Sequence, residues 1–207
     1  SNASCLQLSG QNTSISQNYS CTIIMWYFDG SGSWTVNIYG EDLAGNAAVN
    51  SSTSFTFNQL KALVISPSQI TFNVTIAGTN ITSNQNTTIN NTGNYNATGN
   101  LSLNAINLYA GTSYIDVGNF TADIEPNVDA CDGTFLQNNT YKNISGAIFE
   151  KGNLSLGNAN ETFYYCFTRV PSVASGNYNT DTAGSWTIRI NLIRLLTELF
   201  KITTIFK

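Results

Sequence analysis

The chain has 207 residues, of which only 10% are charged and none is histidine. Typical soluble domains carry about 25% charged residues, so asparagine, threonine and serine must hydrate this surface. The net charge of −4, without a lysine or arginine cluster, argues against nucleic-acid binding. The lack of histidine excludes serine–histidine and cysteine–histidine catalysis within the chain. No apolar run reaches the length of about 18 residues that a membrane span requires.

Short segments in which apolar and polar residues alternate recur along the chain, and they predict an all-β fold. The first three residues, Ser1-Asn2-Ala3, resemble the remnant of a cleaved expression tag and are left out of this prediction. We expect strands at Ser20–Phe28, Ser33–Gly40, Ala47–Phe57, Leu63–Ile65, Ile70–Ile76, Asn86–Asn90, Asn100–Leu108, Tyr114–Ala122, Gly146–Phe149, Thr162–Arg169 and Ser185–Ile190.

The four cysteines contain no Cys-x-x-Cys pair, so a zinc or redox site is poorly supported. Their even number suits two disulfides in an oxidising compartment. We favour Cys5–Cys21 and Cys131–Cys166, because each pair then falls within one predicted domain. The alternative is that these thiols are free and buried.

The segment Gly32–Ile38 is echoed by Gly184–Ile190, since both read Gly-Ser-Trp-Thr followed by aliphatic residues that alternate with polar ones. In each copy the tryptophan and two aliphatic residues share one face of a strand. Unless the match is a coincidence, it predicts two domains of related architecture. We place the boundary near Asn58–Lys61, which gives domains over 4–58 and 61–190 and a tail over 191–207.

The first copy continues to Asn46, and the segment Gly32–Asn46 resembles the closing hairpin of immunoglobulin-like repeats in microbial surface proteins. Trp34, Val36 and Ile38 would face inward. Asp42 would accept hydrogen bonds from turn amides, and Gly45 and Asn46 tolerate a positive φ. A full repeat has roughly 80–100 residues, so residues 4–58 are expected to form a partial or reduced domain.

A second resemblance begins at Leu63-Val64-Ile65-Ser66-Pro67 and Ile70-Thr71-Phe72, and continues through Gly78, Asn91-Thr92-Gly93-Asn94 and Leu101-Ser102-Leu103. It is similar to another immunoglobulin-like pattern, known from surface-layer and adhesin-like proteins of archaea and bacteria. Asn73 stands where that pattern usually has glycine. The resemblance implies a secreted, cell-surface and archaeal protein more directly than it implies any activity.

Asn-x-Ser/Thr sequons, the acceptor sites for N-linked glycans, are dense up to Asn160 and do not occur after it. A composition rich in asparagine, serine and threonine creates some sequons by chance, which is the alternative to their use. A glycan must project from the surface, so used sites should be accessible. The sequons are at Asn12, Asn18, Asn50, Asn73, Asn80, Asn86, Asn90, Asn96, Asn100, Asn119, Asn138, Asn143, Asn153 and Asn160.

The strictest alternation lies at Ile70–Ile76, where period two places Asn73 on the polar face together with Thr71 and Thr75. This acceptor therefore has a geometric reason to be exposed. The glycosylation sites that we single out are Asn73, Asn80, Asn86, Asn96, Asn119, Asn143 and Asn153.

The stretch Asp123–Gly133 is rich in carboxylates, and calcium prefers several oxygen ligands. The candidate calcium ligands are Asp123, Glu125, Asp129 and Asp132. Their spacing does not match an EF-hand, and a solvated loop stapled through Cys131 is the alternative. A carboxylate pair for glycoside hydrolysis is the least favoured interpretation. For Glu41–Asp42 we prefer turn capping to an interdomain calcium site.

Aromatic residues cluster at Trp26-Tyr27-Phe28 and Phe163-Tyr164-Tyr165. Because neighbours in a strand face opposite sides, part of each cluster belongs to a core. Tyr27 and Tyr164 are the candidates for stacking on a sugar, and packing at the core or its rim is the alternative.

The tail from Ile190 to Lys201 places Arg194, Glu198 and Lys201 on one helical stripe between apolar faces. This pattern predicts a short amphipathic helix that docks on a neighbouring domain, mediates self-association or leads towards an anchor, and whose apolar faces are covered. The alternative is that the tail continues as a strand and ends in disorder.

These observations predict tandem immunoglobulin-like β-sandwich domains with a short C-terminal helix. The preferred function is a non-enzymatic, extracellular structural module of a surface-layer (S-layer) or envelope glycoprotein. Its partners would be neighbouring domains or copies of the same surface protein, and calcium is the only cofactor considered. The alternative is an adhesin or carbohydrate-binding module. An enzyme, the third hypothesis, would need a cleft with two facing carboxylates.

Overall fold

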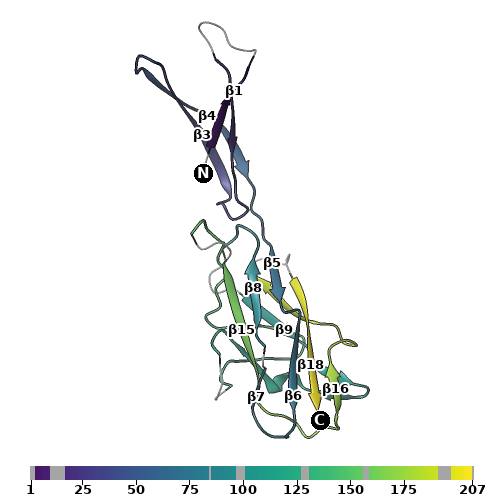
Figure 1. The fold of residues 1–207 in the computed structure, drawn as a ribbon. Coiled ribbons are helices and arrows are strands. Elements are labelled where there is room, and N and C mark those ends of the chain that lie inside the picture. Colours follow the sequence, from purple (N-terminus) through teal and green to yellow (C-terminus); the bar gives the residue numbers. More distant parts are fainter. Residues whose placement is uncertain are drawn as a thin grey trace.

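A computed structural model describes residues 3–9, 17–83, 85–96, 101–126, 131–155, 159–190 and 197–206. In these residues the protein is all-β, with several mainly antiparallel sheets, one 3-10 turn (η1, Val117–Asn119) and no α-helix. The described residues contain no helix that is long and apolar enough to cross a membrane. Figure 1 shows an elongated molecule in which N-terminal hairpins project from a larger body.

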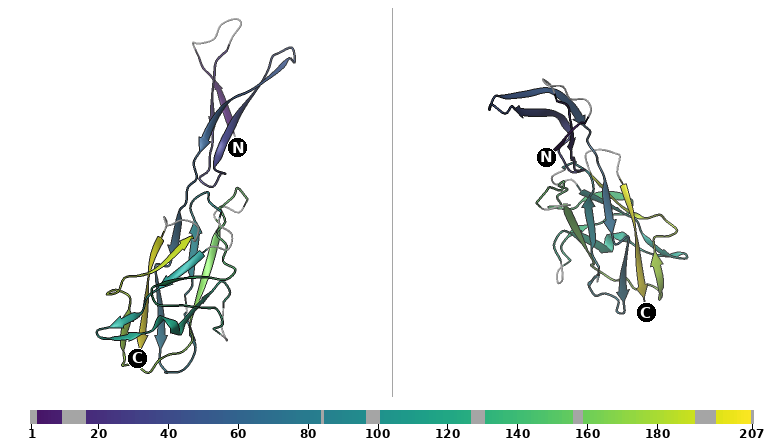
Figure 2. Two further views of the ribbon diagram at one scale, coloured as in Figure 1. Left: turned by 180° about the vertical axis from the view of Figure 1, so that it is seen from behind. Right: turned by 45° about the horizontal axis from the view of Figure 1, so that its top comes forward.

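The projecting part consists of two separate two-stranded sheets. Strand β1 (Ala3–Gln7) pairs with β2 (Tyr19–Ile23), and β3 (Gly32–Glu41) pairs with β4 (Ala47–Phe57). The two hairpins diverge away from the body (Figure 2). Since a two-stranded sheet cannot enclose a core, Phe28 is the only buried residue among those described between 3 and 57.

The body contains two larger sheets. The six-stranded sheet has the order β13-β12-β15-β8-β5, with β7 paired to β15. Its strands are β5 (Leu63–Ser66), β7 (Ile81–Thr82), β8 (Thr87–Asn91), β12 (Phe120–Asp123), β13 (Thr134–Phe135) and β15 (Asn160–Phe167).

The eight-stranded sheet has the order β11-β10-β16-β18-β17-β9-β14, with β6 paired to β18. Its strands are β6 (Gln69–Val74), β9 (Leu101–Ala105), β10 (Leu108–Ala110), β11 (Ser113–Ile115), β14 (Thr140–Asn143), β16 (Gly176–Asn179), β17 (Trp186–Ile190) and β18 (Thr197–Phe206). The β6–β18 pair is parallel, and the other strand pairs are antiparallel.

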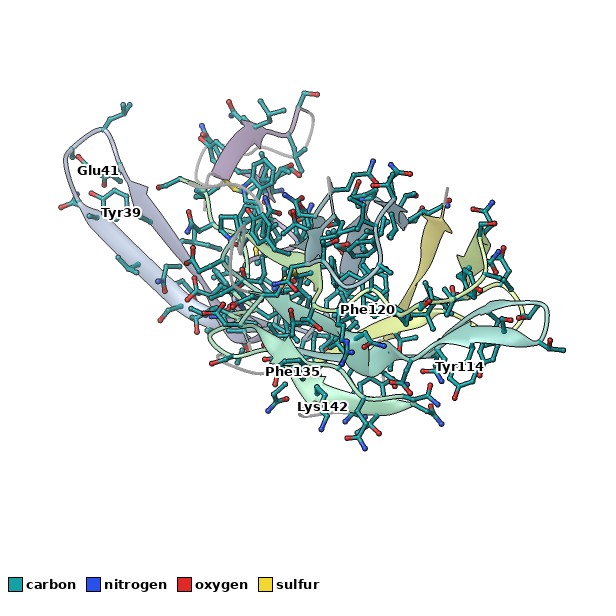
Figure 3. The ribbon with its side chains drawn as sticks, turned by 90° about the horizontal axis from the view of Figure 1, so that it is seen from below. Tyr39, Glu41, Tyr114, Phe120, Phe135 and Lys142 are labelled. Atoms are coloured by element: carbon teal, nitrogen blue, oxygen red, sulfur yellow. A yellow bond between two sulfur atoms is a disulfide. The ribbon has the colours of Figure 1, made fainter. Side chains whose placement is uncertain are left out.

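Both sheets contribute side chains to one hydrophobic core. Phe120 lies at its centre, with its ring centroid 4.2 Å from that of Phe167 and 5.7 Å from that of Trp186. Figure 3 shows Phe120 inside the body, while Tyr114 and Phe135 lie towards the periphery. Burial of these rings supplies a large share of the apolar area that stabilises the body.

The tail prediction was wrong where the structure describes the tail. Residues 197–206 form strand β18 and not a helix. The first half of β18 pairs with β17, and the second half pairs with β16 and with the distant β6. Backbone hydrogen bonds to three strands outweigh a helical stripe of three charged residues, which contributes only a few tenths of a kcal/mol per pair. Arg194 lies outside the described residues.

Four other strand predictions need correction. The strand expected at Tyr114–Ala122 is interrupted by η1, and the one expected at Ser20–Phe28 ends at Ile23. No strand forms over Gly146–Phe149, because Gly146 adopts a φ of 76° inside the turn that the Ala147 amide closes on the Ile144 carbonyl. The strand expected at Asn100–Leu108 is divided between β9 and β10. The break lies at the buried Asn107, whose side-chain oxygen accepts a hydrogen bond from the Val117 amide at 2.9 Å.

The echo between the two Gly-Ser-Trp segments extends to the backbone. Gly32 and Gly184 both have a positive φ, 132° and 122°. Both tryptophan indoles donate to a backbone carbonyl, Trp34 to Gly30 at 2.8 Å and Trp186 to Ile106 at 2.9 Å. Their surroundings differ, since Trp186 is fully buried whereas Trp34 is half-buried beside Phe55.

Candidate functional site

Both disulfides form with the predicted pairing, Cys5–Cys21 and Cys131–Cys166. The first bridges directly opposed residues of β1 and β2. The second ties the loop before β13 to β15, and both of its cysteines are buried. Two disulfides are typical of an oxidising, extracellular environment.

The sequon asparagines are accessible wherever the structure describes them. Asn73 is exposed, as its place on the polar face of β6 predicted. The other exposed acceptors are Asn18, Asn50, Asn80, Asn96, Asn138, Asn143, Asn153 and Asn160, and the half-buried ones are Asn86, Asn90 and Asn119. Asn12 and Asn100 lie outside the described residues.

The buried asparagines of the described chain are Asn91, Asn94 and Asn107, and none of them begins a sequon. Their side chains bond to backbone groups, which explains why burial is tolerated. Accessible acceptor asparagines and buried structural asparagines are therefore separate sets.

Asn94 holds the segment that connects the N-terminal hairpins to the body. Its side-chain oxygen accepts from the Leu60 amide at 2.6 Å, and its side-chain nitrogen donates to the Asn58 carbonyl at 3.0 Å. The Asn94 amide donates back to the Leu60 carbonyl at 2.9 Å. The Asn91-Thr92-Gly93-Asn94 motif thus clamps the connection, a role that sequence reasoning did not assign to it.

A second set of contacts reinforces this junction. The Lys151 ammonium donates to the Phe28 carbonyl at 3.0 Å, and the Lys61 ammonium lies 4.6 Å from the centre of the Tyr95 ring. The Lys151 amide also donates to Asn96 at 2.5 Å. The hairpins are therefore held to the body at two places, the connecting segment and the Trp26–Asp29 turn.

We expect Gly93→Ala to open the clamp. A Cβ atom at Gly93 would lie 2.9 Å from the Ala62 amide nitrogen and closer still to the Leu60 carbonyl oxygen, so backbone must move. Limited proteolysis should then cleave near residues 58–62 faster than in the parent protein. Gly40→Ala is the matched control, since nothing lies within 4 Å of a Cβ there. Equal cleavage of both variants would contradict the clamp.

The Glu41–Ala47 turn is capped by Asp42, as we expected. The Asp42 carboxylate accepts from the Ala44 amide at 2.9 Å, the Asn46 amide at 2.8 Å and the Asn46 side chain at 2.8 Å. Gly45 has a φ of 85°, whereas Asn46 contributes through these bonds and not through a positive φ. At the same tip, the Tyr39 hydroxyl donates to Glu41 at 2.6 Å (Figure 3).

The hydrogen bonds from Asn46, first from its side chain and then from its amide, lower the pKa of Asp42. A lowered pKa in the folded turn means that the stabilisation is present above the ordinary aspartate pKa of about 3.9 and is lost as the pH falls through the lower folded value. NMR shifts of the Ala44 and Asn46 amides should therefore titrate with a midpoint below that of a free peptide spanning the turn. Asp42→Asn should abolish this titration, and a midpoint equal to the peptide's would contradict the capping.

The predicted calcium ligands are only partly described. Asp123 lies on β12 and its carboxylate accepts from the Ile124 amide at 2.7 Å, while Glu125 and Asp132 are exposed. Asp129 lies outside the described residues. Among the residues that are described, no group of three or more histidine, cysteine or acidic side chains is placed to hold a metal ion. Calcium binding by this loop therefore stays a prediction.

The two candidate aromatics lie in different surroundings. Tyr27 packs edge-on against Phe28, with ring centroids 5.0 Å apart, at the base of the hairpins. Tyr164 is half-buried on β15 and lines a cavity of about 230 Å³. Its neighbour Tyr165 belongs to the core and also contributes to the lining of this cavity. Burial raises the pKa of Tyr165 well above its ordinary range.

The strand register explains how this cavity forms. Asp123 of β12 lies opposite Tyr164 of β15, and Cys166 lies opposite both Thr121 and Thr82. Directly opposed residues share a face, so these side chains line the face of the sheet away from the core. The loop before β8 and the loop after β12 supply Ser83, Gln85, Asn86 and Pro126, and Tyr165 of β15 completes the lining.

The structure thus brings together Asp123 and Tyr164, which the sequence marked for different reasons. It also adds Thr82, Gln85 and Asn86, which no local pattern connected to them.

The chain is an all-β protein with several antiparallel sheets and two disulfides. No protein-family model and no curated protein matches it.

Proposed function

We propose that this protein is a non-enzymatic, extracellular structural module of a surface-layer or envelope glycoprotein. The observation that carries the proposal is the separation of its asparagines. Each described sequon asparagine is at least partly accessible, and none of the buried asparagines of the described chain begins a sequon. A chance origin of the sequons gives no reason for this separation, whereas attachment of a bulky glycan requires it.

The low charge supports the same conclusion. With 10% charged residues, the surface has few groups that hold water strongly. Large apolar side chains are also exposed, among them Leu43, Ile76 and Leu154. Glycans at the neighbouring sequons would hydrate this surface and shield these side chains.

The finer fold assignment is part of the proposal. We regard the body as an immunoglobulin-like β-sandwich, because its two large sheets share one core. We regard residues 4–58 as a reduced relative, because the Gly-Ser-Trp segment repeats both its sequence and its glycine φ. The kinship with archaeal surface-layer proteins rests on the resemblance of the motifs.

The mechanical role follows from how the parts are joined. Asn94 accepts from Leu60 and donates to Asn58, Lys151 donates to Phe28, and these hydrogen bonds fix the hairpins to the body; a disulfide crosslinks each part. A surface lattice needs modules that keep their shape and orientation. Its partners would be neighbouring domains or further copies of the same protein.

A carbohydrate-binding or adhesin module is the second candidate. The cavity beside Tyr164 is the observation that favours it, because an aromatic ring, a carboxylate and side-chain amides line one recess.

Glycopeptide mass spectrometry of the protein isolated from the envelope of its source cells tests the preferred function. We expect sugar on several accessible sequons, Asn73 among them, and none on Asn91, Asn94 or Asn107. Recovery of the protein from the envelope fraction, with its exposed loops cleaved by protease added to intact cells, checks the location. Unmodified peptides at all sequons, or a protein found only in the cytosol, would overturn the proposal.

A further inference from the structure

The recess beside Tyr164 combines groups that suit a pyranose, and we propose that it binds one neutral sugar ring. The Tyr164 ring provides an apolar surface for the C–H groups of a sugar face. The Asp123 carboxylate, directly across on β12, accepts hydrogen bonds from hydroxyls. The amides of Gln85 and Asn86 can both donate and accept, which suits the mixed character of sugar hydroxyls.

Size and charge narrow the ligand class. A cavity of about 230 Å³ has room for one six-membered ring, since a cavity of roughly 150 Å³ holds benzene. The described lining residues include no lysine or arginine, so they do not suit a phosphate or another anion. Among these described residues Asp123 is the one carboxylate, whereas glycoside hydrolysis uses two. Binding without cleavage is the function that this lining supports.

The sugar ring that occupies this recess would come from one of two sources, a glycan attached to the protein itself or a free saccharide. Asn86 lines the recess and begins the sequon Asn86-Thr87-Thr88, so a glycan attached there starts inside the proposed site. Its first ring could stack on Tyr164 without leaving its own chain. A free saccharide could reach the same groups from solution. The chemistry is shared, and the two sources are separated by whether Asn86 is modified; only the first source rests on the proposed function.

The first arm uses the full chain produced without glycosylation, titrated with glucose, galactose, mannose and N-acetylglucosamine by ligand-observed NMR. We expect saturation transfer to at least one sugar. Tyr164→Ala and Asp123→Asn should each weaken binding by about tenfold, which corresponds to about 1.4 kcal/mol. Tyr164→Phe keeps the ring and should retain binding. Tyr114→Ala, on an exposed tyrosine of β11 outside the recess, is the matched control.

The second arm uses the glycosylated protein. A glycan on Asn86 should give nuclear Overhauser effects between its first ring and the Tyr164 ring, and Asn86→Gln should remove them. Asn96→Gln, which removes an exposed sequon outside the recess, should leave them intact.

Sugar contact in either arm supports the site and identifies the source. Absence of contact in both arms overturns the inference, even if other sequons carry glycans. Conversely, free-sugar binding by a protein that is never glycosylated supports the site while the glycoprotein proposal fails.

Discussion

Replacing Trp186 by alanine is expected to lower the free energy of unfolding of the body by about 3–5 kcal/mol, the range for a large aromatic removed from a core. Trp186 is fully buried, its ring contacts Phe120 and Tyr165, and its indole donates to Ile106. The substitution removes these contacts, leaves a cavity and deprives the Ile106 carbonyl of its donor. Urea unfolding followed by far-ultraviolet circular dichroism measures the loss.

Trp34→Ala is the matched control, because it removes the same side chain from the same Gly-Ser-Trp sequence. Trp34 is half-buried, stacks on Phe55 alone and lies on a two-stranded sheet. We expect a loss of about 1 kcal/mol or less, typical of substitutions outside a core. Equal losses for the two tryptophans would show that the N-terminal hairpins bury a core that the described residues do not contain.

Removing the Cys131–Cys166 disulfide has the second large expected effect. The two cysteines are 35 residues apart, so replacing both by serine should cost about 4 kcal/mol of stability through the freed chain entropy alone. Both positions are buried, so the serine hydroxyls add a desolvation cost. The unfolding midpoint of the body in urea should fall accordingly.

The Cys5–Cys21 pair supplies the comparison. Its loop is shorter, with a separation of 16 residues, and both cysteines are exposed on a hairpin outside the body. The double serine variant should loosen that hairpin, as amide hydrogen exchange of β1 and β2 would report, and leave the body's unfolding midpoint unchanged. A drop in the body's midpoint equal to that of the first variant would contradict the expectation that the Cys5–Cys21 hairpin contributes little to the stability of the body.

Much of the strand content could be predicted from local patterns. The strand Ala47–Phe57 and the alternation around Ile70–Val74 are read directly from side chains that must lie on one face or the other. The tail failed because its local pattern was helical, while the partners of β18 lie on β6, β16 and β17. Of these partners, β16 and β17 are close in the chain, but β6 is more than a hundred residues away, and no local pattern reports such a pairing.

For the candidate site too, some features could be predicted from local sequence patterns and others depend on contacts between distant segments. Sequons, cysteines and the Asp42 turn are local signals. The structure confirms the cysteine pairing and the Asp42 capping and leaves the described sequon asparagines accessible. The recess is not local, because its lining comes from β7, β12, β15 and two loops. Asp123 and Tyr164 were both singled out, but for unrelated chemistry, because nothing in the sequence places them opposite each other.

The sequence by itself determined the all-β class and the accessibility of the acceptor asparagines, because each depends on local alternation or on side-chain polarity. It also indicated the pairing of the cysteines, because each pair falls within one predicted domain. Tertiary structure alone decided which Gly-Ser-Trp copy has a core, where the tail pairs and which polar residues share a recess. Those outcomes depend on strand register and sheet order, which arise from the simultaneous packing of segments far apart in the sequence.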